Sequence, residues 1–192
     1  MQPFNIYLTG VGGQGIGLLS EVLMRAADHA GLPVQAVDTH GLAQRGGIVI
    51  SNIRVGENVH SPLIGSGDAD MIVALECHEA LRSMNAFLKD AGTLVYYNTS
   101  WQPIEVRLNQ APPVTPEVIA AESQRRKIKA VAVFKEGLTD VRMQNTVVLA
   151  KIAVDGLVPG IETEHYRAAF DDLLAGSVLE KNLTLFDAEI KV

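Results

Sequence analysis

The fold is decided by residues 4–17, Phe4-Asn5-Ile6-Tyr7-Leu8-Thr9-Gly10-Val11-Gly12-Gly13-Gln14-Gly15-Ile16-Gly17. The first half is a short apolar run with β-branched and aromatic residues, which is typical of a buried strand. The second half holds five glycines within eight positions. Apolar residues then recur at helical spacing from Leu18 to Ala27. The stretch therefore predicts a strand, a tight turn and a helix.

The glycine spacing in this turn predicts an anion-binding site. Gly10-x-Gly12-x-x-Gly15 matches the phosphate-binding turn of dinucleotide folds. In such turns the glycines let the backbone approach an anion, and the helix N-terminus offers unpaired N–H groups and a positive dipole end. The alternative is that the glycines serve only a tight turn and close helix packing. Both interpretations are open at this point.

Length and composition indicate one compact domain spanning residues 1–192. Hydrophobic residues make up 47% of the chain and aromatic residues 5%, which is typical of an aliphatic folded protein rather than a disordered one. The net charge of −6 argues against nucleic-acid or anionic-membrane partners, because these need clustered basic surface. No apolar run is long enough for a membrane span, and no basic n-region begins the chain, so we expect a cytoplasmic protein.

Cysteine and histidine patterns indicate no metal site. Cys77 is the only cysteine, so the chain alone can form no intramolecular disulfide and cannot supply the usual four thiolates of an iron–sulfur cluster. Cys77-His78 could be a nucleophile and a base, although a lone cysteine is more often a small buried hydrophobe. Of the histidines, only His40 is expected near the glycine turn, and none has metal-ligand spacing. We therefore expect no catalytic residue and no metal ligand.

The second predicted strand, Val34–Asp38, ends in an acidic residue. Dinucleotide folds use an acidic residue about 20 positions beyond the glycines to hold the ribose hydroxyls, and Asp38 lies near that distance. However, only nine residues separate Asp38 from the next predicted strand, 48–55. A parallel crossover takes about a dozen residues or more, usually with a helix. We therefore expect strand 48–55 not to be the next parallel unit.

The rest of the chain alternates between strand and helix patterns. Further strands are expected at 71–75, 91–98 and 129–134, with a weaker candidate at 104–108. Further helices are expected at 79–89, at 116–126, from 138 onward, from 163 to 174 and at 177–190.

A second glycine-bearing segment, residues 39–47, follows the second strand. In an open α/β sheet, the loop that leaves this strand is expected beside the loop that leaves the first strand, so both should face one crevice. Arg45 would then place a guanidinium beside backbone N–H groups, an arrangement suited to phosphate or carboxylate. A solvent-exposed arginine in a surface turn is the equal alternative.

Taken together, these motifs make the sequence resemble the gamma-type subunits and domains of 2-oxoacid:ferredoxin oxidoreductases, and most closely the small beta subunits of the indolepyruvate ferredoxin oxidoreductases. The resemblance covers nearly the whole chain. It rests on Thr9-Gly10-Val11-Gly12-Gly13-Gln14-Gly15, on His40-Gly41-Leu42-Ala43-Gln44-Arg45-Gly46-Gly47 with Ser51 and Arg54, on Ala69-Asp70, on Glu76 with Glu79-Ala80-Leu81-Arg82, and on Asn98 with Pro103-Ile104. The match is loose only between Pro112 and Lys129.

The resemblance implies a fold and a place in a larger enzyme. The fold would be α/β, a three-layer Rossmann-like sheet that is mostly parallel, with at least one antiparallel strand and helices on both faces. The activity would be CoA-dependent oxidative decarboxylation of arylpyruvates to aryl-acetyl-CoA, with electrons passed to ferredoxin. Thiamine diphosphate and the iron–sulfur clusters would belong to a large alpha subunit, in a heteromer such as α2β2, and this chain alone would bind no cofactor.

The resemblance also implies which residues face the site. These are Gly12, Gly13, Gln14, Gly15, Gln44, Arg45, Gly46 and Gly47. Arg45 and the amides of the glycine turn would contact a phosphate or carboxylate, coenzyme A being the candidate co-substrate.

Two alternatives belong to other functional classes. One is a free-standing module that binds NAD or FAD through residues 10–15 and Asp38. The other is a structural scaffold without a ligand.

Overall fold

The computed structural model describes residues 2–39, 47–101, 106, 108–109 and 112–191. The strands are β1 (Phe4–Val11), β2 (Val34–Thr39), β3 (Ile48–Val55), β4 (Ala69–Ala74), β5 (Leu88–Tyr97) and β6 (Lys129–Val133). The helices are α1 (Ile16–His29), α2 (Cys77–Phe87), α4 (Pro116–Arg125), the 3-10 helix η1 (Val141–Met143), α5 (Gln144–Val154), α6 (Thr163–Leu173) and α7 (Gly176–Glu189).

The described strands form a six-stranded mixed sheet in the order β2-β3-β1-β4-β5-β6. Strands β1, β4, β5 and β6 run parallel, whereas β3 is antiparallel to both of its neighbours, β1 and β2. The antiparallel β3 confirms the expectation from the short gap after Asp38, because a tight connection can join antiparallel strands but cannot cross over the sheet. It also means that β1 and β2 are not adjacent.

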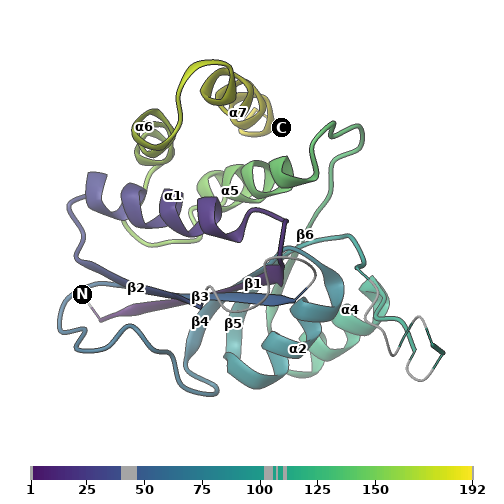
Figure 1. Cartoon of the computed structure of the whole chain (residues 1–192). Helices are drawn as coiled ribbons and strands as arrows, with labels where there is room; N and C mark the ends of the chain where they lie inside the picture. The colour runs from purple at the N-terminus through teal and green to yellow at the C-terminus, as the bar shows by residue number, and fades with distance from the viewer. Residues whose placement is uncertain (1, 40–46, 102–105, 107, 110–111, 192) are drawn as a thin grey trace.

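Helices cover both faces of the sheet (Figure 1). Helices α1 and α5 lie on one face, and α2 and α4 lie on the other. Alternate residues of β1 supply the two cores: Ile6 and Leu8 belong to the cluster under α1 and α5, while Tyr7 belongs to the cluster over α2 and α4. The predicted α/β architecture, mostly parallel with helices on both faces, is confirmed.

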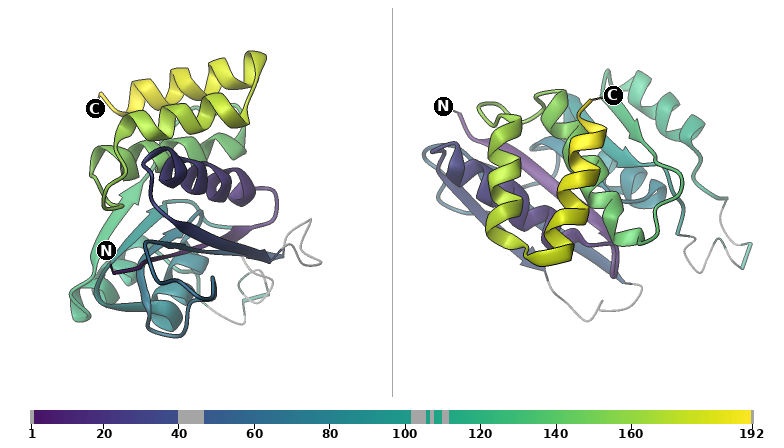
Figure 2. Two further views of the ribbon diagram at one scale, coloured as in Figure 1. Left: turned by 90° about the vertical axis from the view of Figure 1, so that its left-hand side faces the viewer. Right: turned by 90° about the horizontal axis from the view of Figure 1, so that it is seen from above.

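An outer helical pair was not part of the expected layering. Helices α6 and α7 lie over α1 and α5, away from the sheet (Figures 1 and 2). Phe170 of α6 and Phe186 of α7 are fully buried, and their rings meet edge to face at 5.4 Å. The C-terminal region therefore extends the core on the α1 side instead of covering the sheet directly.

Most predicted element boundaries agree with the structure within a few residues. Helix α2 begins at Cys77 rather than Glu79, because the side chain of Glu76 accepts hydrogen bonds from the backbone N–H groups of His78 and Glu79 and caps the helix. The weak strand candidate at 104–108 falls mostly on residues that the structure does not describe, and Val106 within it is not in a strand. In the described part of the chain, no helix combines the length and hydropathy needed to cross a membrane.

Candidate functional site

The glycine turn, residues 10–15, lies where the helices diverge from the sheet. Strands β1 and β4 are parallel neighbours, but α1 leaves β1 toward one face and α2 leaves β4 toward the other (Figure 1). Such a topological switch point opens a crevice at the carboxyl ends of the strands, the usual ligand-binding position of open α/β sheets. The sheet topology therefore places the predicted turn at the position where a site is expected.

The glycines of this turn are required by its conformation. Gly13 and Gly15 have φ of 101° and 86°, in the left-handed region that favours glycine. A Cβ on Gly10 would lie 2.9 Å from Oε1 of Gln14, and one on Gly15 would lie 2.7 Å from Nδ2 of Asn145. Turn geometry and packing thus explain these three glycines without a ligand.

Gln14 holds the turn across the crevice. Its side chain is fully buried, and its Oε1 accepts from the N–H of Val11 at 2.7 Å. Its Nε2 donates to the carbonyl oxygen of Leu75, directly after β4, at 3.0 Å. The side chain of the predicted site residue Gln14 therefore joins the ends of the two strands, and the residue as a whole is buried.

The last residue of the second glycine-bearing segment, Gly47, meets the glycine turn. The N–H of Gly12 donates to the carbonyl oxygen of Gly47 at 2.9 Å, and Val11 is paired with Ile48 at the start of β3. Gly47 therefore lies beside the turn, and the expectation that the whole segment faces the same crevice stays a prediction. Gln44, Arg45 and Gly46, together with His40, lie outside the described residues.

A cavity of about 410 Å³ lies beside the α1 end of the glycine turn. Gly15 and Leu18 form one wall, η1 and the start of α5 form a second, and α7 forms the third. Arg142 and Lys181 bring positive charge to this cavity, but Arg142 is paired with Asp140 at 2.6 Å. Hydrogen bonds from Arg142 lower the pKa of Asp140 to about 2. No sequence pattern indicated this cavity, because α1 and the other two walls lie more than a hundred residues apart in the chain.

Two buried carboxylates, Glu76 and Glu79, lie at the start of α2. Glu79 accepts from the hydroxyl of Thr9 at 2.8 Å and from Nε of Arg82 at 3.0 Å. Burial raises the pKa of the carboxyl group of Glu76. Because Thr9 lies in β1 and Glu79 in the first turn of α2, the bond between them fixes the start of α2 against the strand that carries the glycine turn.

Cys77 and His78 do not form a catalytic pair. Burial and the nearby Glu76 raise the pKa of the Cys77 thiol to about 11, which disfavours the thiolate that a nucleophile needs. The thiol contacts Asn98 Oδ1 at 3.5 Å, and Nε2 of His78 accepts from the N–H of Val114 at 3.4 Å. The two side chains thus have separate structural partners.

Asp38 is engaged away from the glycine turn. Its Oδ1 accepts from the hydroxyl of Ser20 on α1 at 3.1 Å and from that of Ser51 on β3. The carboxylate therefore ties α1 to the sheet, and this engagement disfavours the alternative in which Asp38 holds a dinucleotide ribose.

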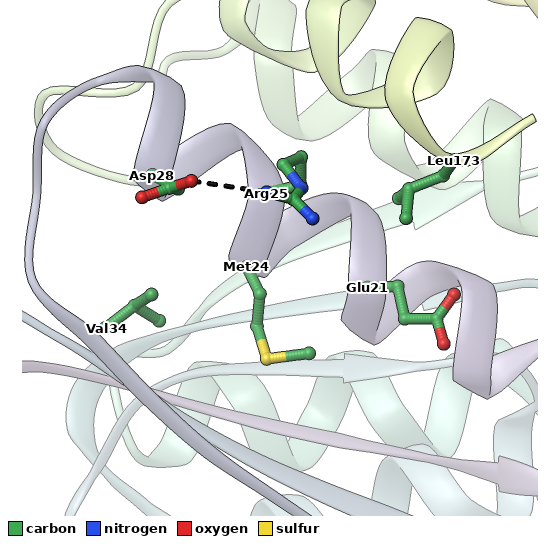
Figure 3. Close-up of a pocket in the computed structure, with 6 residues that line it drawn as sticks. All are labelled: Glu21, Met24, Arg25, Asp28, Val34 and Leu173. Atoms are coloured by element: carbon green, nitrogen blue, oxygen red, sulfur yellow. Dashed lines mark hydrogen bonds and ion pairs between the residues drawn. The ribbon is translucent and has the colours of Figure 1, made fainter.

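Two further observations concern other parts of the surface. A cavity of about 410 Å³ between α1, β2 and α6 is rimmed by Arg25 and Asp28, which pair with each other at 3.4 Å (Figure 3). Glu21 also lines this cavity, which lies along α1 and is separate from the cavity beside Gly15. Within the described ranges, no group of three or more His, Cys, Asp or Glu side chains could hold a metal ion.

Comparison with known proteins shows to which family the chain belongs. The family model described as pyruvate ferredoxin/flavodoxin oxidoreductase matches residues 5–191. Two curated proteins named indolepyruvate oxidoreductase subunit IorB are similar over nearly their whole lengths. The one from Archaeoglobus fulgidus is 33% identical over 184 residues, covering 93% of this chain and 90% of that protein. The one from Pyrococcus horikoshii is 30% identical over 196 residues, covering 100% and 96%.

Solved structures with the same fold come from the same group of enzymes. Pyruvate oxidoreductase subunit PORC from Thermotoga maritima matches with a TM-score of 0.66 at 21% identity, covering 100% of this chain and 97% of that one. The 2-oxoglutarate:ferredoxin oxidoreductase from Magnetococcus marinus, solved with 2-oxoglutarate, coenzyme A and succinyl-CoA bound, matches with a TM-score of 0.65 at 21% identity. The match covers all of this chain but 31% of that longer one. At these identities the likeness establishes the fold.

Proposed function

Because the chain belongs to the pyruvate ferredoxin/flavodoxin oxidoreductase family, we propose that it is the small subunit of an enzyme that oxidatively decarboxylates aryl 2-oxo acids such as indolepyruvate. In the proposed reaction the 2-oxo acid loses CO₂, its acyl group passes to the thiol of coenzyme A, and the released electron pair reduces ferredoxin. The curated relatives, which are named as indolepyruvate oxidoreductase subunits, support this substrate class.

The contribution of this chain is to bind and orient a substrate at the switch-point crevice. The observation that supports the proposal is the hydrogen bond between Gly12 and Gly47, since it puts the last residue of the second glycine-bearing segment against the glycine turn. The amides of Gly13 and Gly15, with Arg45 and its neighbours Gln44 and Gly46, are proposed to contact a phosphate or carboxylate, whereas the N–H of Gly12 is used in its bond to Gly47. Coenzyme A, whose phosphates suit such contacts, is the proposed ligand.

The redox chemistry is assigned to a partner. Thiamine diphosphate, which stabilises the carbanion left by decarboxylation, and the iron–sulfur clusters are proposed to lie in a large alpha subunit. The donor set of this chain fits that division, because its one cysteine is buried and protonated at neutral pH. We propose that residues 1–192 act as one domain in a cytoplasmic heteromer, such as α2β2, and that ferredoxin docks on the partner.

Reconstitution tests this function. The purified chain should show no 2-oxo acid oxidation with CoA and ferredoxin until a large thiamine- and cluster-bearing subunit is added. Arg45→Ala should raise the KM for CoA in the reconstituted enzyme, whereas Arg25→Ala, on the far part of α1, should leave that KM unchanged. Turnover by the isolated chain would contradict the subunit assignment, and an unaltered KM in Arg45→Ala would contradict the role of Arg45.

Calorimetry on the isolated chain distinguishes the proposed subunit from the alternative, a free-standing dinucleotide-binding module. A dinucleotide-binding module would give a micromolar signal with NAD or FAD. We expect neither cofactor to give such a signal.

A further inference from the structure

A buried polar relay connects the C-terminal helix to the glycine turn. Its members are Asn145 and Thr146 at the start of α5 and Asn182 in the middle of α7, and their exposed fractions are 1%, 0% and 7%. Polar side chains buried to this extent are costly unless their hydrogen bonds are made, so their arrangement restrains the elements that carry them. None of these residues was selected from the sequence.

The first link joins α5 to the glycine turn. Nδ2 of Asn145 donates to the carbonyl oxygen of Gly15 at 3.2 Å. The same carbonyl accepts the first backbone bond of α1, from the N–H of Leu19 at 3.1 Å. The amide also occupies the space where a Cβ on Gly15 would lie. Asn145 is therefore packed against the residue that ends the turn and begins the helix.

The second link joins α5 to α7. The hydroxyl of Thr146 lies 2.6 Å from Oδ1 of Asn182 and 3.2 Å from Oδ1 of Asn145. A hydroxyl has one proton to donate, and the shorter distance assigns it to Asn182. Nδ2 of Asn182 donates to the carbonyl oxygen of Val178 at 2.8 Å, which fixes the orientation of this amide. If α7 moved away, the Thr146 proton would become available to Asn145.

Helix α7 is the last helix of the chain and lies in the outer layer, away from the sheet (Figure 1). Its buried residues are Asn182, Leu185 and Phe186, and among the described residues no side chain caps its N-terminus. Ion pairs of Asp187 and Glu189 with Arg167 and Lys135 also hold it. An outer helix opens more readily than the central sheet. The bond from Thr146 to Asn182 is thus one of several contacts that dock α7, and α7 also forms one wall of the cavity beside Gly15.

We propose that Asn145 is a positioning residue for the glycine turn and that Asn182, acting through Thr146, makes the position of that turn depend on the docking of α7. The C-terminal helix then controls the geometry of the candidate site without touching its ligand. The link between turn geometry and turnover rests on the function proposed above, whereas the relay itself concerns this chain alone.

Hydrogen exchange in the full chain tests the relay. The reporter amides are Leu19 and Gly12, and the reference amide is Ile72 in the central strand β4. In Asn145→Leu, which has a similar side-chain shape but no donor and no charge, both reporters should exchange about fivefold faster relative to Ile72, the factor expected for one neutral hydrogen bond. Asn182→Ala should give a smaller increase at the same two amides. The control is Thr184→Ala, an exposed position on the same helix, which should change neither.

Two exchange results would overturn the relay. In the first, Asn182→Ala leaves Leu19 and Gly12 unchanged. In the second, it accelerates them by the same factor as Ile72, as a general loss of stability would.

Reconstituted enzyme then tests the link to the site. Asn182→Ala should raise the KM for CoA with little change in kcat, and Thr184→Ala should change neither. A KM that stays at the wild-type value while the reporters exchange faster would overturn control of the site by α7. Absence of turnover in the reconstituted wild-type enzyme would instead count against the proposed function, and the exchange result would stand independently of it.

Discussion

Gly15, at the end of the glycine turn, and Gly17, in α1, are expected to respond to alanine in opposite directions. Gly15 has φ of 86°, and a Cβ there would approach Nδ2 of Asn145 to 2.7 Å. Gly17, in the first turn of α1, lacks a positive φ, and a Cβ there would meet nothing within 4 Å. Their similar sequence context hides different structural requirements.

The magnitudes follow from these environments. In Gly15→Ala, the left-handed conformation costs about 1–2 kcal/mol for a residue with a Cβ. Displacing the amide of Asn145 removes a hydrogen bond worth about 1 kcal/mol more. The free energy of unfolding should therefore fall by about 2–3 kcal/mol. In Gly17→Ala it should rise by about 0.4–1 kcal/mol, because alanine restricts the unfolded chain and fits the native backbone.

Urea denaturation followed by circular dichroism measures both values against the wild type. The reasoning would be refuted if Gly15→Ala were as stable as the wild type, or if Gly17→Ala were destabilised as much as Gly15→Ala. Turnover of the reconstituted enzyme that carries Gly17→Ala should also be measured. Lost activity in a chain of raised stability would mean that a ligand or partner approaches α1 at this glycine.

Two further predictions concern the thiol of Cys77 and the carboxylate of Asp38. The pKa of the Cys77 thiol is about 11 in the folded chain, against an ordinary 9.0. As the pH rises, the unfolded chain therefore loses this proton before the folded chain does. The free energy of unfolding should fall by about 2–3 kcal/mol between about pH 9 and pH 11. Urea titrations across this range should show the fall in the wild type and a smaller one in Cys77→Ala, and equal slopes would argue against it. Asp38→Ala should lower the free energy of unfolding by about 1–3 kcal/mol, because Ser20 and Ser51 lose their shared acceptor. A micromolar NAD signal in calorimetry that this substitution abolishes would contradict the structural role of Asp38.

Local patterns were sufficient for most of the fold. The strand, glycine turn and helix of residues 4–29 could be predicted because apolar periodicity and backbone freedom act between near neighbours. The short gap between β2 and β3 also predicted that β3 would not be a parallel unit, since chain length limits the connection. The start of α2 was predicted at residue 79 instead of Cys77, because the sequence does not show that the carboxylate of Glu76, after the strand expected at 71–75, caps the helix.

Side-chain partners, in contrast, were decided by the tertiary structure. The spacing between the glycines and Asp38 made Asp38 a candidate ribose ligand. That spacing does not show which way the carboxylate points, and in the structure it accepts from the hydroxyls of Ser20 and Ser51. Gln14 was predicted to face a ligand, but its amide joins Val11 to Leu75 across the switch point.

What the sequence by itself determined is the class of sheet, the glycine turn and the family, because these depend on spacing along the chain. Only the tertiary structure decided that Gly12 meets Gly47 and that Asn145 and Asn182 link α7 to that turn. Contacts between segments so far apart depend on how the layers pack, and packing is set by all the buried side chains together.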